Sequence, residues 1–231
     1  MKIQADILRK FIQKTSLNGL IEGSVIEFTD NGIKIWNRNV QGSVAIFGLL
    51  KKECIKDYEV KSNIGIKSNS VLLKLLKRFV GEIEFVSINN VLTIVNEKKK
   101  VEIVEGNENY IDSKITQEIN LEYSNAPLNI SVDIFTNSVN NMSDLEAMHL
   151  KIIINNKVME LIAGEEGFNK VSERHNIEYD NMNVMVGTVF KDVVTQLDNN
   201  IWASFKDNCP IQIVEGNDNY NVKYIIAPLM E

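Results

Sequence analysis

A ten-residue segment occurs twice in this 231-residue sequence, and an internal repeat constrains the fold of a chain more than any single motif does. Residues 101–110 read VEIVEGNENY, and residues 211–220 read IQIVEGNDNY, 110 positions later. In both copies an apolar run that favours a β-strand meets Gly and Asn and then an aromatic residue, which predicts a strand, a turn and a second strand. The two copies predict that the chain is a tandem duplication.

Two amphipathic helices are predicted in each half of the sequence, in the same order. In the first half they cover residues 5–15 and 70–80, where apolar side chains recur with the 3.6-residue period of a helix. Their counterparts cover residues 134–142 and 189–197. The offsets between the copies are 127, 118 and 110 residues for the first helix, the second helix and the ten-residue segment, as expected for two collinear repeats with short deletions. The apolar positions of the first pair are Ile7, Leu8, Phe11 and Ile12, then Val71, Leu72, Leu75, Leu76 and Phe79.

Short runs rich in β-branched and aromatic residues, separated by polar turns, occupy the sequence between these helices. Asp-Asn-Gly at residues 30–32 and Asn-Asn at residues 89–90 are typical of hairpin turns. The predicted strands are residues 24–28, 33–36, 43–49, 58–66, 82–88, 91–95 and 99–104, then 150–154, 157–163, 176–179, 182–186, 201–205, 210–214 and 222–227. The predicted fold class is therefore α+β, with two helices packed on antiparallel sheets in each of two domains, residues 1–114 and 128–231, joined by a linker at residues 115–127.

The charge of the chain is distributed unevenly. The formal total is -6, from 25 basic and 31 acidic groups, which argues against a nucleic-acid binder that is basic overall. Residues 1–115, however, contain 18 basic and 14 acidic groups, whereas residues 116–231 contain 7 and 17, so the halves carry +4 and −10. Any basic surface should therefore lie in the first half.

The two first-half helices carry cations opposite their apolar faces. A solvated helix face is the ordinary interpretation of one such group, but two helices at equivalent positions favour a ligand. Spaced cations suit the phosphate backbone of nucleic acid, and contact with it carries no sequence information. Because Phe11 and Phe79 lie on the apolar faces, base stacking is not expected, and sequence-independent contact with a duplex fits better. The six cations are Arg9, Lys10, Lys14, Lys74, Lys77 and Arg78.

Residue patterns for catalysis or metal binding are missing from the sequence. It contains no GxxxxGK[ST], HExxH or GxSxG motif, and His149 and His175 are isolated. The pair Glu165-Glu166 beside Gly167 predicts an exposed loop rather than paired catalytic carboxylates. The chain is therefore expected not to be an enzyme and to use neither a cofactor nor a metal.

Cys54 and Cys209 are too few and too far apart for a disulfide framework or a CxxC metal site, and both are expected to be reduced. No window reaches the roughly 18 apolar residues of a membrane span, and residues 1–6 lack the features of a signal peptide. We therefore expect an intracellular protein without a membrane partner.

Several segments resemble the DNA sliding clamps, the family of the proliferating-cell nuclear antigen (PCNA) and the T-even phage clamp, and the resemblance covers the whole chain. The segments are Ile7-Leu8-Arg9-Lys10, Asp30-Asn31-Gly32-Ile33-Lys34-Ile35, Lys74-Leu75-Leu76-Lys77, Gly167-Phe168-Asn169-Lys170-Val171 and the terminal Lys223-Tyr224-Ile225-Ile226-Ala227-Pro228-Leu229-Met230-Glu231. The resemblance implies a non-enzymatic processivity factor, in which three two-domain subunits form a homotrimeric ring. Twelve helices would line a hole for double-stranded DNA, and the ring would tether the DNA polymerase after loading by a clamp-loader ATPase.

The resemblance also implies functional positions. The six cations named above, together with Lys191 in the second half, would face the hole. The other second-half positions that match the outer faces of these helices are neutral or acidic, which predicts a weak and off-centre hold on DNA. They are Thr136, Asn137, Asn140 and Asn141, which match Arg9, Lys10, Gln13 and Lys14, and Asp192, Thr195 and Gln196, which match Lys74, Lys77 and Arg78.

Clamp partners insert a short peptide with apolar anchors between a loop, the linker and the C-terminal tail. The matching positions are Val40 and Val44 in the loop, Ile119, Leu121 and Pro127 in the linker, and Ile225, Ala227 and Pro228 in the tail. An alternative interpretation is that these are core residues or apolar residues exposed by chance.

Subunit contact in the family joins two strand edges, for which residues 110–117 and 175–179 are the candidates. The alternative function is a non-enzymatic structural protein that assembles through β-edges and does not encircle DNA.

Overall fold

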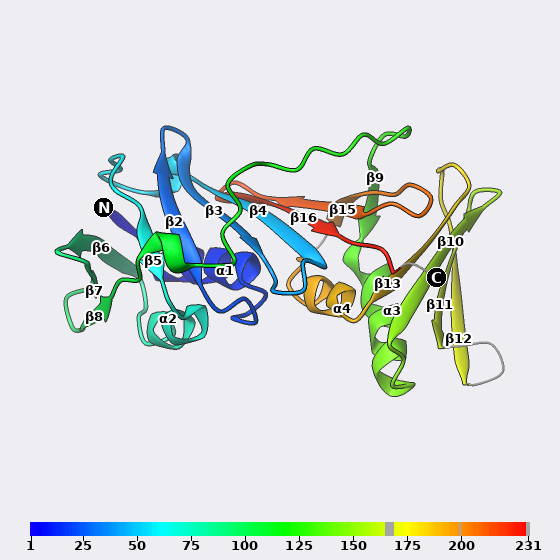
Figure 1. Cartoon of the computed structure of the whole chain (residues 1–231), viewed down its shortest axis with the longest axis horizontal. Helices are drawn as coiled ribbons and strands as arrows, with labels where there is room; N and C mark the ends of the chain where they lie inside the picture. Colours follow the sequence, from blue (N-terminus) through cyan, green and yellow to red (C-terminus); the bar gives the residue numbers. More distant parts are fainter. Residues whose placement is uncertain (165–168, 199, 230–231) are drawn as a thin grey trace. The chain divides into compact units, whose positions relative to one another are not determined.

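The computed structural model of the chain describes residues 1–164, 169–198 and 200–229. It divides into two compact units, which are described separately (Figure 1). The first contains residues 1–41, 45–118 and 216–222, and the second contains residues 42–44, 119–215 and 223–231. The loop expected at Glu165-Glu166 and the clamp-like dipeptide Gly167-Phe168 lie outside the described residues.

The first unit contains two helices and two antiparallel sheets. One sheet has the strand order β1-β6-β7-β8, and the other has β5-β2-β3-β4. The elements are β1 (Lys2–Gln4), α1 (Ala5–Thr15), β2 (Ser24–Thr29), β3 (Gly32–Arg38), β4 (Val44–Lys51), the short 3-10 helix η1 (Lys52–Cys54), β5 (Ile64–Ile66), α2 (Asn69–Leu76), β6 (Glu82–Ile88), β7 (Val91–Val95), β8 (Lys100–Val104) and η2 (Glu108–Tyr110).

The second unit repeats this plan. Its sheets have the strand orders β16-β15-β14-β9 and β12-β11-β10-β13. The elements are β9 (Leu128–Ser131), α3 (Val132–Asp144), β10 (His149–Asn155), β11 (Val158–Gly164), β12 (Lys170–Asn176), β13 (Met182–Gly187), α4 (Val189–Val194), β14 (Asn200–Ser204), β15 (Ile211–Gly216) and β16 (Tyr220–Ile226).

The order of elements and the order of strands both show a duplication. The sheet β1-β6-β7-β8 corresponds to β9-β14-β15-β16, and β5-β2-β3-β4 corresponds to β13-β10-β11-β12. In each unit a short strand leads directly into the first helix, and the second helix leads into the last three strands. The predicted α+β class, with duplicated helices on antiparallel sheets, is confirmed.

The ten-residue repeat, in contrast, does not mark equivalent positions. Its first copy covers β8 and η2, whereas its second copy covers β15 and the start of β16. The strand equivalent to β8 is β16, which begins 120 residues after it, the same offset that separates α2 from α4. The predicted offset of 110 residues therefore aligns β8 with β15, one strand before its true equivalent β16. An apolar strand followed by a polar turn suits any hairpin, so two such segments can match without being copies of one another.

The core of the first unit forms where α1 and α2 bury their apolar faces. Leu8, Phe11 and Ile12 are buried as predicted, and the rings of Phe11 and Tyr220 lie 6.3 Å apart. Gly48 on β4 allows α1 to approach, because a Cβ there would lie 2.4 Å from Cγ2 of Thr15.

The buried face of α2 differs slightly from the predicted one. It is centred on Leu72, Leu73 and Leu76, so Val71, expected inside, lies at its margin and is 47% exposed. Phe79, which follows the helix, is buried as predicted.

Three aromatic rings form the centre of the second unit. Phe135 of α3 meets Phe190 of α4 edge to face, with ring centroids 5.2 Å apart, and it also contacts Phe205. Most positions predicted to lie on the inner faces of these helices are buried, including Val139, Met142 and Val194, whereas Ile134 and Val189 are half-buried.

Some predicted strands are shorter or shifted. Of residues 58–66 only β5 is a strand, and Tyr58 instead donates its hydroxyl to the carbonyl of Thr29. Of the strand expected at residues 176–179, only Asn176 belongs to a strand. It is the last residue of β12, which begins at Lys170. No helix of the described residues is long and apolar enough to cross a membrane.

Candidate nucleic-acid interface and partner-binding surface

Helix α1 presents fewer free cations than its sequence predicts. Lys10 is exposed, whereas Arg9 is half-buried and its guanidinium donates to Oδ1 of Asp6 at 2.9 Å. Because that pair lies on one exposed helix surface, it lowers the effective charge of Arg9 only modestly. Lys10 is thus the cation of α1 that is most open to a ligand.

The expected exposure of Lys14 is wrong. Its side chain is only 3% exposed, and its Nζ lies 5.9 Å from the centroid of the Tyr220 ring. Tyr220 belongs to the short segment near the C-terminus that packs in the first unit. The helical period places residue 14 at the flank of the apolar face, and this distant aromatic residue covers that flank.

Three exposed cations mark the end of α2. Ser68 begins the helix by accepting the Val71 amide, and the helix ends at Leu76. Lys74 lies in the last turn, Lys77 is the C-cap residue and Arg78 follows, a placement that the helix dipole favours. Since α1 and α2 contact each other, these three side chains and Lys10 belong to one pair of helices (Figure 1).

We call Lys10, Lys74, Lys77 and Arg78 the open cation group. Within the residues that the structure describes, no salt bridge joins any of these four side chains to a carboxylate. Four unneutralised cations on two adjacent helices form a surface on which phosphate groups can bind without base contacts.

The helices of the second unit offer no comparable group. On α3, Asn137 and Asn140 are exposed, and Asn141 donates to the Glu173 carboxylate at 2.7 Å. On α4, Lys191 is half-buried beside Asp192, whose pKa is raised by burial. Lys191 therefore lies next to an acidic residue in the sequence, and the net charge of this helix surface is close to zero.

Three segments expected to form the partner pocket come together in the second unit. The amide of Ala227 donates to the carbonyl of Ser43 at 2.9 Å, and Nζ of Lys223 donates to the carbonyl of Ile119 at 3.3 Å. These contacts join the loop, the linker and the tail. Tyr123 also anchors the linker, because its hydroxyl donates to the carbonyl of Pro210 at 2.8 Å.

The residues expected to line the partner pocket fall into a buried group and an exposed group. Val44 and Ile225 are 1% and 5% exposed, so the expectation that they line an open pocket is wrong, and the alternative interpretation as core residues holds for these two. The remaining second-unit positions are at least partly exposed: Ile119, Leu121, Pro127, Ala227 and Pro228.

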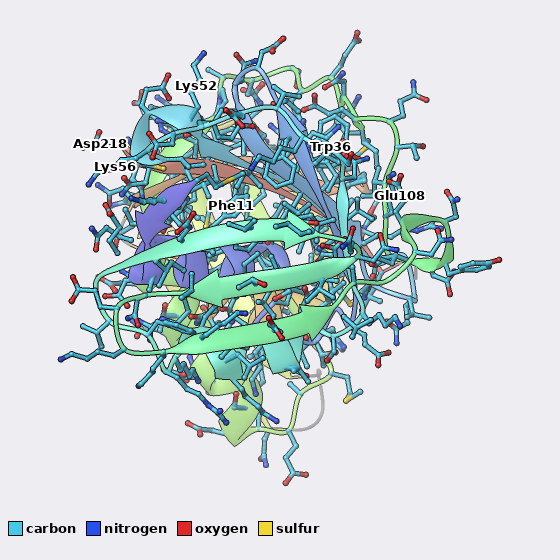
Figure 2. The ribbon with its side chains drawn as sticks, turned by 90° about the vertical axis from the view of Figure 1, so that its left-hand side faces the viewer. Phe11, Trp36, Lys52, Lys56, Glu108 and Asp218 are labelled. Carbon is cyan, nitrogen blue, oxygen red and sulfur yellow. The ribbon has the colours of Figure 1, made fainter. Side chains whose placement is uncertain are left out.

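Val40 lies on a different surface, within the first unit. It is 98% exposed and lines a cavity of about 620 Å³ together with Leu20 and Tyr110, which are 68% and 83% exposed. Leu20 and Tyr110 were not predicted as surface residues of this kind, because a single apolar residue in a polar turn gives no periodic signal. Figure 2 views this unit from the side of β6, β7 and β8, with Glu108 of η2 labelled.

Open strand edges are present in both units. Strand β8 is an edge of its sheet, and β12 is an edge of a sheet in the second unit. The expectation of a strand at residues 110–117 is wrong, because η2 ends at Tyr110 and only an isolated bridge, between Asn37 and Lys114, follows. Of residues 175–179, only His175 and Asn176 belong to the edge strand β12.

Metal chemistry has no support in the part of the chain that the structure describes. No group of three or more His, Cys, Asp or Glu side chains there could hold a metal ion.

No protein-family model matches the sequence, and a search of curated proteins gives no significant match. Solved structures do match. A. fulgidus PCNA, solved with the C-terminal region of FEN-1 bound, superposes with a TM-score of 0.85 at 13% identity, over 100% of this chain and 98% of that one. PCNA from Entamoeba histolytica gives a TM-score of 0.83 at 13% identity, over 99% and 98% of the two chains.

A third structure, the PCNA2-PCNA3 complex from Sulfolobus tokodaii, gives a TM-score of 0.73 at 15% identity, over 100% and 99% of the chains. The chain has the fold of the PCNA sliding clamps. The matches span 99–100% of this chain, so the clamp fold covers both units.

Proposed function

We propose that this chain is the subunit of a sliding clamp, a non-enzymatic processivity factor that encircles double-stranded DNA as a homotrimeric ring and tethers the replicative DNA polymerase. The observation that carries the proposal is the full-length match to PCNA clamps at TM-scores of 0.73 to 0.85. A ring opened and closed on DNA by a clamp-loader ATPase is part of the same proposal.

The open cation group is the proposed contact with DNA. Lys10, Lys74, Lys77 and Arg78 would hold backbone phosphates without reading sequence, as a clamp that slides requires. Arg9 would contribute through the part of its charge that Asp6 leaves free, and Lys191 would be a minor contact. Because α3 carries asparagines at the matching positions, most of the hold would come from one unit of each subunit.

Partner peptides are proposed to bind the second-unit surface formed by Ile119, Leu121, Pro127, Ala227 and Pro228. The A. fulgidus neighbour was solved with a C-terminal region of FEN-1, so a peptide from the end of a replication protein is the ligand class that we expect here. Apolar anchors on such a peptide would bury the exposed parts of these side chains. Val40 belongs to the first unit and is not part of this proposed surface.

Assembly is proposed to pair the β8 edge of one subunit with the β12 edge of the next, because ring closure would bury two otherwise open edges. On the core side of β8, Val101 and Ile103 are half-buried, although they pair with the fully buried Ile94 and Leu92. A neighbouring strand would complete their burial. Ile103→Lys should therefore break the assembly, whereas Ile88→Lys, at an exposed position of β6, should not.

The function is tested by polymerase processivity on primed circular DNA with the matching loader. The triple variant Lys74→Gln/Lys77→Gln/Arg78→Gln should shorten the products. The control Lys52→Gln/Lys157→Gln/Lys206→Gln removes the same charge from exposed positions outside the cation group and should behave as the wild type. If the first variant loads and supports synthesis as well as the wild type, the proposed DNA contact is wrong.

A further inference from the structure

The first unit contains a cavity of about 820 Å³, and of its lining residues only Arg78 is used in the clamp assignments above. Its wall is formed by β1, the start of β6, the turn after α2 and the hairpin between β7 and β8. Arg78 of the open cation group lines it, and so do Lys98 and Lys99 of the hairpin. The cavity thus joins a helix end already proposed to contact DNA with two further cations on another element.

The hairpin has a defined backbone. Oδ1 of Asn96 accepts the amides of Lys98 and Lys99 at 3.1 and 2.9 Å, and the Asn96 amide donates to the carbonyl of Lys99 at 2.9 Å. An Asx turn of this kind holds the two lysines in place before a ligand arrives, so little loop entropy is lost on binding.

The two lysines have different surroundings. Nζ of Lys99 donates to the carbonyl of Arg78 at 2.6 Å, which attaches the hairpin to the end of α2. Lys98 is exposed, and no salt bridge involves it within the described ranges. Lys99 therefore positions the hairpin beside Arg78, and Lys98 is the side chain that can reach a ligand.

The carboxylates around the cavity leave a net positive charge next to the helix. Glu82 lines it but is held in an ion pair by Lys56, whose hydrogen bond lowers the pKa of Glu82. Glu84 and Glu97 also line the wall, opposed by Lys2, Arg78, Lys98 and Lys99. With Lys74 and Lys77 on the adjoining helix, cations clearly exceed free carboxylates along this side.

We propose that the β7–β8 hairpin is a second phosphate-contacting element, in which Lys98 binds the backbone of duplex DNA and Lys99 fixes the hairpin to α2. The inference rests on the proposed function and adds a contact outside the helices. The first unit would then carry a strip of cations that continues from Lys74 and Lys77 through Arg78 to Lys98. This strip would supply DNA affinity that the neutral helices of the second unit do not provide.

The test measures the salt dependence of binding to a short fluorescent DNA duplex between about 50 and about 200 mM salt, where each phosphate contact contributes a slope of about −0.9. Lys98→Gln should reduce the magnitude of the slope by about 0.9 for each copy of Lys98 that contacts DNA. The matched control Lys52→Gln removes an exposed lysine of the same unit and should leave the slope unchanged.

A third variant, Lys77→Gln, separates the two proposals. If Lys77→Gln lowers the slope and Lys98→Gln does not, the hairpin contact is wrong and the clamp proposal stands. If neither changes it, the proposed DNA surface itself fails. Free phosphate shares the same chemistry, so a parallel titration replaces part of the chloride by phosphate at equal ionic strength. A loss of wild-type duplex affinity that Lys98→Gln does not share would show a site for free phosphate and would overturn the duplex assignment.

Discussion

Asn69, the first residue of α2, is predicted to be one of the most sensitive polar positions of the first unit. Its side chain is fully buried, and its Nδ2 donates to the carbonyl of Ile21 at 2.8 Å and to Oγ of Ser24 at 2.7 Å. Each of these hydrogen bonds contributes about 1 kcal/mol net. Truncation also opens a small cavity that costs about 1–2 kcal/mol. We therefore expect Asn69→Ala to lower the free energy of unfolding by about 3–4 kcal/mol.

Urea unfolding followed by circular dichroism, at one protein concentration, measures this loss. Asn140→Ala, on the exposed face of α3, is the matched control and should change the free energy of unfolding by less than about 0.5 kcal/mol. Asn69→Asp keeps the shape but replaces the donor with a carboxylate that faces a carbonyl. It should destabilise at neutral pH and recover as the carboxylate protonates in acid. If Asn69→Ala unfolds at the wild-type urea concentration with an unchanged slope, the hydrogen bonds do not hold α2 in place.

Three further outcomes are expected. Phe135→Ala, which removes the ring shared by Phe190 and Phe205, should cost about 3–5 kcal/mol in the second unit, measured by urea unfolding; a loss below about 1 kcal/mol would contradict this packing. Gly48→Ala should lower the thermal midpoint, because the new methyl group would lie 2.4 Å from Thr15; an unchanged midpoint would mean that α1 can move away freely. Lys114 and Asn63 lower the pKa of Glu108, so its contribution is present above the unfolded-state pKa and is lost as pH falls through the folded-state pKa. Glu108→Gln should therefore be slightly less stable than the wild type at neutral pH and equal to it in acid, and a difference that persists in acid would exclude this ion pair as its cause.

The helices were predictable because their signal is local. The period of apolar residues in α1 and α3 identified the buried faces around Phe11 and Phe135 correctly. Periodicity cannot show which distant segment covers the flank of a helix, however. Lys14 was assigned to an exposed surface, although Tyr220 lies over it from the other end of the sequence.

Strand assignments failed where the sequence pattern was shared by several structures. The short strands β1 and β9 were missed because three or four residues before a helix are too few to show alternation. Residues 110–117 carry apolar and aromatic side chains but form a 3-10 turn and an irregular segment. The ten-residue repeat matched a strand followed by a 3-10 turn (β8 and η2) with a hairpin (β15 and β16), so similarity of turns did not establish equivalence of strands.

The candidate surfaces were predictable to different degrees. The end of α2 was identified because Lys74, Lys77 and Arg78 lie in a short charged segment. The hairpin lysines and the apolar surface around Tyr110 were not identified, since both depend on the approach of loops that are distant in sequence. Burial separated Val44 and Ile225 from the other pocket positions, and sequence alone offered no means of doing so.

The measurement that tests the proposed ring most directly is the mass of the purified protein in solution, determined by light scattering during size-exclusion chromatography. Three chains of 26.2 kDa predict a mass of about 79 kDa for the wild type, and Ile103→Lys at the open edge of β8 should reduce it to that of the single chain. A wild-type mass of 26.2 kDa at micromolar concentration, unchanged by the Ile103→Lys substitution, would contradict the ring.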